Sequence, residues 1–301
     1  MNIVIEGNEQ FVETLRQYYH QEIDHDNSIP HTKFVISRQN FKVIAYNSNK
    51  VMFQGKNARQ EAAIWQEQLK HDLKEEVINR MVNVSLLESI GSDEVGTGDY
   101  FGPVVVCACY VNEAIIERLT RFNITDSKLL NDDYISSVAP EIAQLVPHVS
   151  YVLANKTYNK AHQTNNLNQI KAKMHNYVIA SLIKKINKKP MIIVDQFCSE
   201  KNYYQYLRDT PNTIIKGIHF ETKAESKYLA VALASILARY IFLEEINKIA
   251  QRLQMNIVKG AGFLVDEVGI QIVNKHGFEI LDEIAKTHFK NTNKIKEKLK
   301  Q

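Results

Sequence analysis

The sequence predicts an α/β protein made of a small N-terminal unit and a larger C-terminal one. Short runs of β-branched and aromatic residues alternate with amphipathic helical segments along the chain, as expected for interleaved strands and helices. The length of 301 residues is enough for two hydrophobic cores. A glycine-rich loop preceded by two acids appears only in the larger part. We therefore predict two domains, residues 1–82 and 83–301.

The composition limits the cellular setting and the partners. The net charge is only +3 and does not by itself indicate nucleic-acid binding, although residues 286–301 contain six lysines and a single acid, Glu297. The three cysteines, an odd number without metal-ligand spacing, argue against a disulfide framework. The N-terminus lacks a signal-peptide pattern, and no apolar run reaches the roughly 18 residues of a membrane span. We expect a cytoplasmic protein with no membrane partner.

The N-terminal unit has the pattern of a small sheet with helices. Apolar residues recur at helical spacing over residues 9–24, and β-rich runs predict strands at 34–36, 41–46 and 50–54. An amphipathic helix should follow from residue 58 to 81. The unit carries no nucleophile constellation, and its basic residues fit a solvated sheet face better than a phosphate-binding one.

A glycine-rich loop at residues 96–102 follows two adjacent acids at the end of a predicted strand. Asp93 and Glu94 should point to opposite faces of a regular strand, so both can serve one site only if the strand ends or bulges at the glycines. Glycine leaves no side chain in the way, so the N–H groups of the loop can approach a phosphate or a sugar. Locally, two interpretations stay open: a metal-dependent site for phosphate esters and a hairpin with two solvated acids.

Strands and helices alternate after the loop. Strands are expected at residues 104–111, 149–154, 190–195 and 212–218, and helices at 113–122, 168–186, 225–253, 265–275 and 280–286. The apolar run that ends in Asp195 is typical of a buried central strand with a functional acid at its carboxyl end, although a turn-capping acid would give the same pattern. Glu225 falls in the first turn of the long helix, where the helix dipole makes a capping role slightly the better explanation.

Taken in order, four motifs resemble those of the type 2 and type 3 ribonucleases H. They are residues 92–103, Asp126-Ser127-Lys128, the strand that ends at Asp195, and residues 223–228 followed by 234–239. The resemblance spans roughly residues 85–290, and four ordered motifs are far more specific than one. Ribonuclease HIII is favoured over HII because type 2 enzymes usually carry Asp at the position of Glu225 and Arg at that of Thr97. The N-terminal unit also looks like that of the type 3 enzymes.

This resemblance implies an RNase H-like fold, with a mixed five-stranded sheet flanked by helices. The small N-terminal α+β domain would resemble the TATA-binding protein and would grip the substrate. The implied activity is endonucleolytic cleavage of the RNA strand of an RNA/DNA hybrid, which leaves 3′-hydroxyl and 5′-phosphate ends. We expect the chain to act as a monomer.

By the same resemblance, the catalytic acids and metal ligands are Asp93, Glu94, Asp195 and Glu225. They would hold two Mg²⁺ or Mn²⁺ ions about 4 Å apart, which activate a water and stabilise the leaving alkoxide. The chemistry agrees, because hard cations prefer oxygen ligands and grouped carboxylates otherwise raise one another's pKa. The resemblance assigns substrate contacts to Gly96, Thr97, Gly98, Ser127 and Lys128. The glycine loop would read the minor groove of the hybrid, where 2′-hydroxyls mark the RNA strand.

Two alternatives stand beside this interpretation. One is a type 2 enzyme that also cuts at single ribonucleotides embedded in DNA. The other is a non-catalytic protein that binds hybrids and uses the acids only structurally, which the complete set of four acids argues against. Metal-dependent cutting of a labelled hybrid separates an enzyme from a binder.

Overall fold

The computed structural model describes residues 2–24, 29–69, 88–119, 121–122, 124, 130–211 and 213–300. The chain divides into two units, Met1–Asn79 and Arg80–Gln301, and each has its own hydrophobic core. The predicted boundary between residues 82 and 83 lies outside the described residues, as do Ser127 and Lys128. None of the described helices is both long enough and apolar enough to cross a membrane.

The small unit is a four-stranded antiparallel sheet with helices packed on it. Its strands follow the order β1 (Asn2–Glu6), β4 (Lys50–Gly55), β3 (Phe41–Tyr46) and β2 (Thr32–Ser37). Helix α1 (Glu9–Tyr18), the 3-10 turn η1 (His20–Glu22) and the helical residues 58–69 complete the unit. The expected strands and helices are confirmed as far as residue 69, and β1 is an additional strand.

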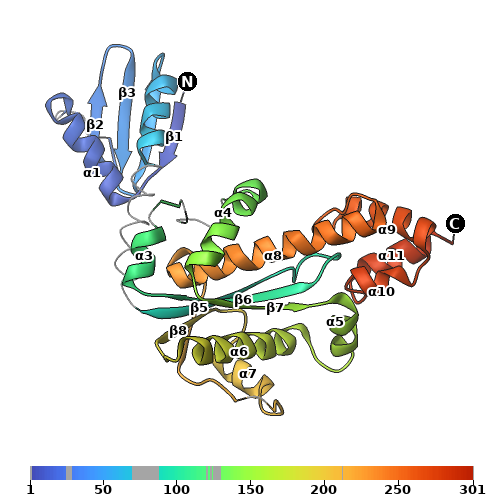
Figure 1. The fold of residues 1–301 in the computed structure, drawn as a ribbon. Coiled ribbons are helices and arrows are strands. Elements are labelled where there is room, and N and C mark those ends of the chain that lie inside the picture. The colour runs from blue at the N-terminus through green and yellow to red at the C-terminus, as the bar shows by residue number, and fades with distance from the viewer. Residues whose placement is uncertain are drawn as a thin grey trace. The chain divides into compact units, whose positions relative to one another are not determined.

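The large unit contains the mixed five-stranded sheet that the resemblance implied (Figure 1). Its strand order is β7 (His148–Leu153), β6 (Val104–Val111), β5 (Ser89–Val95), β8 (Met191–Asp195) and β9 (Ile218–Glu221). The three neighbours β7, β6 and β5 pair antiparallel, whereas β5, β8 and β9 pair parallel. Every residue of β6 is buried, as befits a strand covered on both faces.

Helices cover both faces of this sheet. Helix α8 (Leu229–Leu253) packs against β5 and β6 from one side, and α6 (Leu167–Ile186) and α7 (Glu200–Tyr206) lie on the other side (Figure 1). The remaining helices are α3 (Glu113–Leu119), α4 (Asp132–Leu145), α5 (Asn155–His162), α9 (Phe263–His276), α10 (Ile280–Ile284) and α11 (Lys290–Lys298). Gly91 allows α8 to approach β5 closely, because a Cβ there would lie 2.2 Å from the backbone nitrogen of Val231.

Some segments of the structure differ from what the local sequence pattern suggests. The strand predicted at 212–218 is wrong, because the sheet strand β9 begins only at Ile218. The amide of Asn176 on α6 bonds the carbonyl of Thr213 and the N–H of Ile215, so this backbone is satisfied away from the sheet. The basic C-terminal run is also not a free tail, since α11 packs on α9 and Lys286 is fully buried.

Candidate active site

The two acids that precede the glycine loop lie on opposite faces of β5, as the strand period predicts. The strand keeps a regular register through Val95, with Asp93 opposite Cys107 and Glu94 opposite Val106. Asp93 therefore faces α8, and Glu94 faces α6 on the other side of the sheet. The strand ends at Val95, directly before the glycines, so both side chains lie at the carboxyl edge of the sheet.

Glu94 is held by two cationic or ionisable side chains from α6. The ammonium of Lys171 donates to Oε1 at 2.7 Å, and Nε2 of His175 lies 2.9 Å from Oε2. The other ring nitrogen of His175 lies 2.8 Å from the hydroxyl of Ser92, so the imidazole bridges two residues of β5. Burial acts to raise the pKa of Glu94, but these two partners outweigh burial and leave the pKa below its usual range. Glu94 is thus an ionised acid in a fixed orientation.

The surroundings of Asp93, in contrast, raise its pKa. It is 8% exposed, and burial followed by the charge of Glu94 raises its pKa to about 8. The hydroxyl of Ser235 on α8 and the N–H of Glu94 bond the carboxyl group and partly oppose that rise. The charge of Asp195 raises the pKa further. A carboxyl group whose neighbours raise its pKa to near neutral pH is a strong candidate for binding a cation.

Asp195 and Glu225 complete the acidic group. Asp195 ends β8, the parallel neighbour of β5, and its Oδ1 accepts a hydrogen bond of 2.9 Å from the N–H of Ala224. This bond positions the 3-10 turn η2 (Ala224–Ser226), which carries the buried Glu225 beside Asp195. The prediction that Glu225 lies in the first turn of the long helix is wrong, because α8 begins at Leu229. The turn is set by a tertiary contact with Asp195 and by left-handed backbone at Lys223.

The four acids act on one another electrostatically. Burial raises the pKa of Asp195, and the nearby charges of Glu225 and Glu94 and a hydrogen bond shared with Glu225 raise it further. Their oxygen donors suit a hard divalent cation, which would relieve this repulsion. Among the described residues, no three His, Cys, Asp or Glu side chains are already arranged as a metal site. The carboxylate oxygens of these acids fit a divalent metal ion, and the side chains would have to move closer together to coordinate one.

The glycine loop lines a cavity of about 440 Å³, and Glu94 is the one of the four acids in its lining. Gly96 has a φ of +91°, and a Cβ there would meet the carbonyl oxygen of Pro103 at 2.3 Å, so glycine is required at this position. A Cβ at Gly98 would meet no heavy atom within 4 Å, so packing does not require glycine at this position. Arg239 and Lys259 also line this cavity, and both pair with Asp132.

A second set of contacts holds the loop in place. The buried ammonium of Lys286 donates to the carbonyl oxygens of Asp99 and Gly102, and Asn155 also donates to Gly102. The carboxylate of Asp99 accepts from the N–H of Gly260 at 2.6 Å. Burial lowers the pKa of Lys286 to about 7, and the nearby charge of Asp99 only partly opposes this shift.

Sequence reasoning did not assign a role to Lys171 or His175. Both lie within the apolar stripe of α6, four residues apart and next to Ile170 and Met174. A pair of polar residues at that spacing inside a buried stripe was the available signal, since buried polar groups need partners. Neither Ser127 nor Lys128 can be placed relative to the acids, because both lie outside the described residues.

Comparison with known proteins identifies the family. Residues 90–292 match the family model of ribonuclease HII, and residues 2–77 match a family described only as a domain of unknown function. The chain is 38% identical to the ribonuclease HIII of Geobacillus sp. (strain WCH70), over 97% of both chains. It is also 38% identical to the ribonuclease HIII of Bacillus thuringiensis subsp. konkukian, with the same coverage.

Solved structures agree with the sequence matches. The structure is similar to Bst-RNase HIII in complex with Mn²⁺, with a TM-score of 0.72 and 37% identity over 99% of this chain and 98% of that one. RNase H3 of Aquifex aeolicus shares the fold, with a TM-score of 0.56, 23% identity and coverage of 95% and 99%. The fold, the ordered motifs and these relatives together show that the chain belongs to the ribonuclease HIII family and is a ribonuclease H.

Proposed function

We propose that this ribonuclease H is an endonuclease that hydrolyses the RNA strand of RNA/DNA hybrids and leaves 3′-hydroxyl and 5′-phosphate ends. The observation that carries the proposal is the grouping of four interacting acids, three at the carboxyl ends of β5 and β8 and Glu225 on the adjacent turn η2. One of them, Glu94, lines the cavity of the glycine loop. Grouped carboxylates repel one another, and a bound cation would relieve that repulsion, so the grouping suits a cation-binding site.

The roles of the acids follow from their surroundings. Asp93, Glu94, Asp195 and Glu225 would hold two divalent cations, Mg²⁺ or Mn²⁺. When bound, such ions make a water nucleophilic and stabilise the charge that develops on the leaving 3′ oxygen. Lys171 and His175 fix the orientation of Glu94 and keep it ionised, so that its negative charge is available to a cation at the sheet edge.

The substrate contacts are proposed for the loop and for the N-terminal unit. The backbone of Gly96, Thr97 and Gly98 would lie against the minor groove of the hybrid and test for 2′-hydroxyls. Ser127 and Lys128 would hold a phosphate of the substrate. Residues 1–82 would add phosphate contacts, and residues 83–301 would carry out the hydrolysis, in a protein that acts as a cytoplasmic monomer.

The test is cleavage of an RNA/DNA hybrid labelled on its RNA strand, in Mg²⁺, in Mn²⁺ and in EDTA. We expect internal cuts with either ion and none in EDTA, and the fragments should accept a 3′ extension by a polymerase without phosphatase treatment. A matched DNA duplex should stay intact. Binding of the hybrid without any metal-dependent cut would instead identify a non-catalytic binder.

A further inference from the structure

The glycine loop, residues 96–102, consists of two parts that are held very differently. In residues 96–98, which we call the reading half, the structure describes a single turn hydrogen bond, from the N–H of Asp99 to the carbonyl oxygen of Gly96 at 3.4 Å. Residues 99–102 form the anchor half, in which both aromatic side chains are buried and two N–H groups donate to carbonyl oxygens of other segments at 2.8 Å. The anchor half therefore determines where the reading half lies.

The chain directly after α10 pairs with the anchor half as a short antiparallel strand does. Phe101 and Ala285 form a β-bridge. The ammonium of the next residue, Lys286, donates to the carbonyl oxygens of Asp99, at 2.8 Å, and of Gly102. These two residues are the ends of the anchor half, so one side chain joins both ends.

Lysine is a costly residue at this position. Its side chain is fully buried, and burial lowers its pKa to about 7, whereas an apolar side chain of the same length would fill the space without that cost. The carboxylate of Asp99 accepts from the N–H of Gly260, so the hydrogen bonds of the ammonium go to neutral carbonyl groups. Among the described contacts, the carbonyl of Asp99 accepts only from Lys286, whereas that of Gly102 also accepts from Asn155. Donation of hydrogen bonds to the loop backbone is the function that explains a lysine here.

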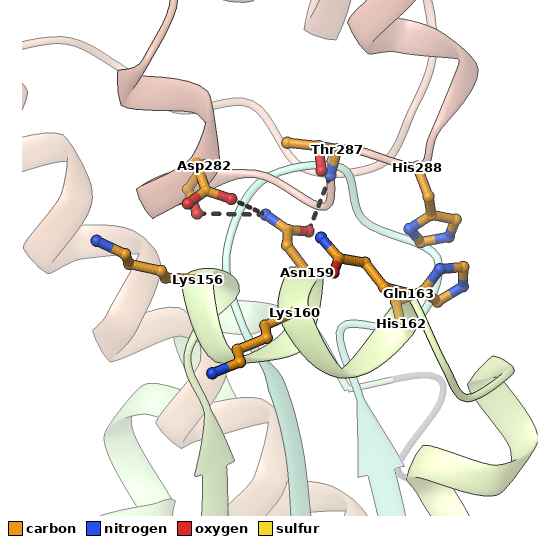
Figure 2. A pocket seen from close by; sticks show the side chains of 8 residues that line it. All are labelled: Lys156, Asn159, Lys160, His162, Gln163, Asp282, Thr287 and His288. Carbon is orange, nitrogen blue, oxygen red and sulfur yellow. Dashed lines mark hydrogen bonds between the residues drawn. The ribbon is translucent and has the colours of Figure 1, made fainter.

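A side chain from α5 fixes the backbone on both sides of Lys286. The amide nitrogen of Asn159 donates to the carbonyl oxygen of Ala285 at 3.0 Å, and its amide oxygen accepts from the N–H of Thr287 at 3.1 Å. The same nitrogen donates to the carboxylate of Asp282 at 3.0 Å, so that Asn159 joins Asp282 to Thr287 (Figure 2). Lys286 thus extends from a backbone that is already held in place.

We propose that Lys286 is a positioning residue for ribose selectivity: by holding Asp99 and Gly102, it places the reading half against the 2′-hydroxyls of the RNA strand. The proposal rests on the proposed function, because it assumes that the reading half lies against the minor groove of the hybrid. A hydrogen bond weakens steeply beyond about 3.2 Å, so a displacement of the loop on the order of 0.5 Å would remove its contact with a 2′-hydroxyl. Contacts elsewhere on the duplex would persist, so loss of the lysine should reduce selectivity for RNA more than overall affinity.

The experiment crosses two changes, a substitution in the protein and the removal of one 2′-hydroxyl from the hybrid. Equilibrium binding in EDTA is measured for full-length wild type and for Lys286→Met, which keeps the length and apolar character of the side chain. The hybrids each carry one deoxyribose in the RNA strand, at successive positions. Asn159→Leu is a second variant, which loosens the backbone around Lys286 without altering its side chain. Asn176→Leu is the matched control, because Asn176 is also buried and donates to a backbone carbonyl, that of Thr213, outside the glycine loop.

In the wild type, we expect that removing a 2′-hydroxyl contacted by the loop weakens binding about three- to tenfold, as for the loss of one hydrogen bond. In Lys286→Met, the same removal should weaken binding less than about twofold, because the reading half is no longer held in place. The penalty for the missing 2′-hydroxyl should be intermediate in Asn159→Leu and should equal that of the wild type in Asn176→Leu.

A wild-type penalty in Lys286→Met would overturn the proposal, even if that variant binds every hybrid more weakly, because a uniform loss is what a purely structural role produces. An equally reduced penalty in the control variant, or no penalty at any position in the wild type, would overturn it as well. If Lys286→Met does not fold, a wild-type penalty in Asn159→Leu refutes the proposal and a reduced one supports it. Failure of the wild type to cut any hybrid in Mg²⁺ would refute the proposed function instead, and the binding comparison would still decide the role of Lys286.

Discussion

The buried ion pair between Lys171 and Glu94 allows a quantitative prediction about stability. Lys171 and Glu94 are 9% and 12% exposed in their side chains, so replacing Lys171 with Met leaves a buried carboxylate with only His175 as a partner. Removal of one member of a buried ion pair costs about 3–5 kcal/mol. Because His175 remains, and Met keeps part of the contact with Phe197, we expect a loss of about 2–3 kcal/mol at pH 7.

The pH dependence of that loss has a definite sign. The pKa of Glu94 is lowered in the folded protein, so the ionised acid contributes stability above the pKa of the unfolded chain, and that contribution disappears as the pH falls through the folded value. The difference between wild type and Lys171→Met should therefore be full at pH 7 and should shrink below about pH 4.5. In the double variant Lys171→Met/Glu94→Gln, most of the stability lost in Lys171→Met should be recovered.

The assay is urea unfolding followed by two signals. The single tryptophan, Trp65, belongs to the small unit, so its fluorescence reports that unit, whereas far-UV circular dichroism also follows the large unit. Only the transition of the large unit should shift. Lys184→Met, on an exposed position of the same helix, is the matched control. A loss below about 0.5 kcal/mol, equal to that of the control, or a loss independent of pH would refute this reasoning.

Three further predictions follow from the same description. Because the pKa of Asp93 is raised to about 8, ionisation of this acid should lower the stability of the folded protein in EDTA as the pH rises from 4 to 9. In thermal unfolding, the stability of Asp93→Asn relative to the wild type should therefore increase over that range, and a constant difference would contradict this. Deleting residues 1–80 should leave a folded large unit that binds hybrid more weakly in a filter-binding titration, with the difference shrinking at high salt; unchanged affinity would give the small unit another role. Because Thr97 offers one short hydroxyl where an arginine would reach further, a duplex with four or more ribonucleotides should be cut well in Mg²⁺ and one with a single ribonucleotide hardly at all; equal cutting in Mg²⁺ would indicate type 2 behaviour, and a parallel series in Mn²⁺ tests for relaxed selectivity.

The parts of the site that depend on strand period could be predicted from the sequence. Alternation of side chains along β5 fixed Asp93 and Glu94 on opposite faces, and the apolar run of β8 fixed Asp195 at a carboxyl end. These features depend only on neighbouring residues and on which strands are buried. The five-stranded sheet came from the ordered motifs and not from periodicity.

The parts that depend on distant contacts could not be predicted in this way. The turn at Glu225 is held by the bond from Ala224 to Asp195, 29 residues away. Asn176 holds residues 213–215 off the sheet, although their composition favours a strand. Lys286 begins a lysine-rich run whose composition is typical of a solvated segment. Its side chain is nevertheless buried and bonds the glycine loop. In each case a side chain elsewhere in the chain overrides the local preference.

The central claim is that the acids at the ends of β5 and β8 carry out metal-dependent hydrolysis. The most direct measurement is the single-turnover rate of hybrid cleavage by Asp93→Asn and Asp195→Asn at saturating Mg²⁺, with hybrid affinity measured in parallel. We predict a fall in rate of at least about a thousandfold for each variant, with affinity within a fewfold of the wild type. A near-normal rate for either variant at saturating Mg²⁺ would contradict the assignment of that acid and, with it, the account of the site.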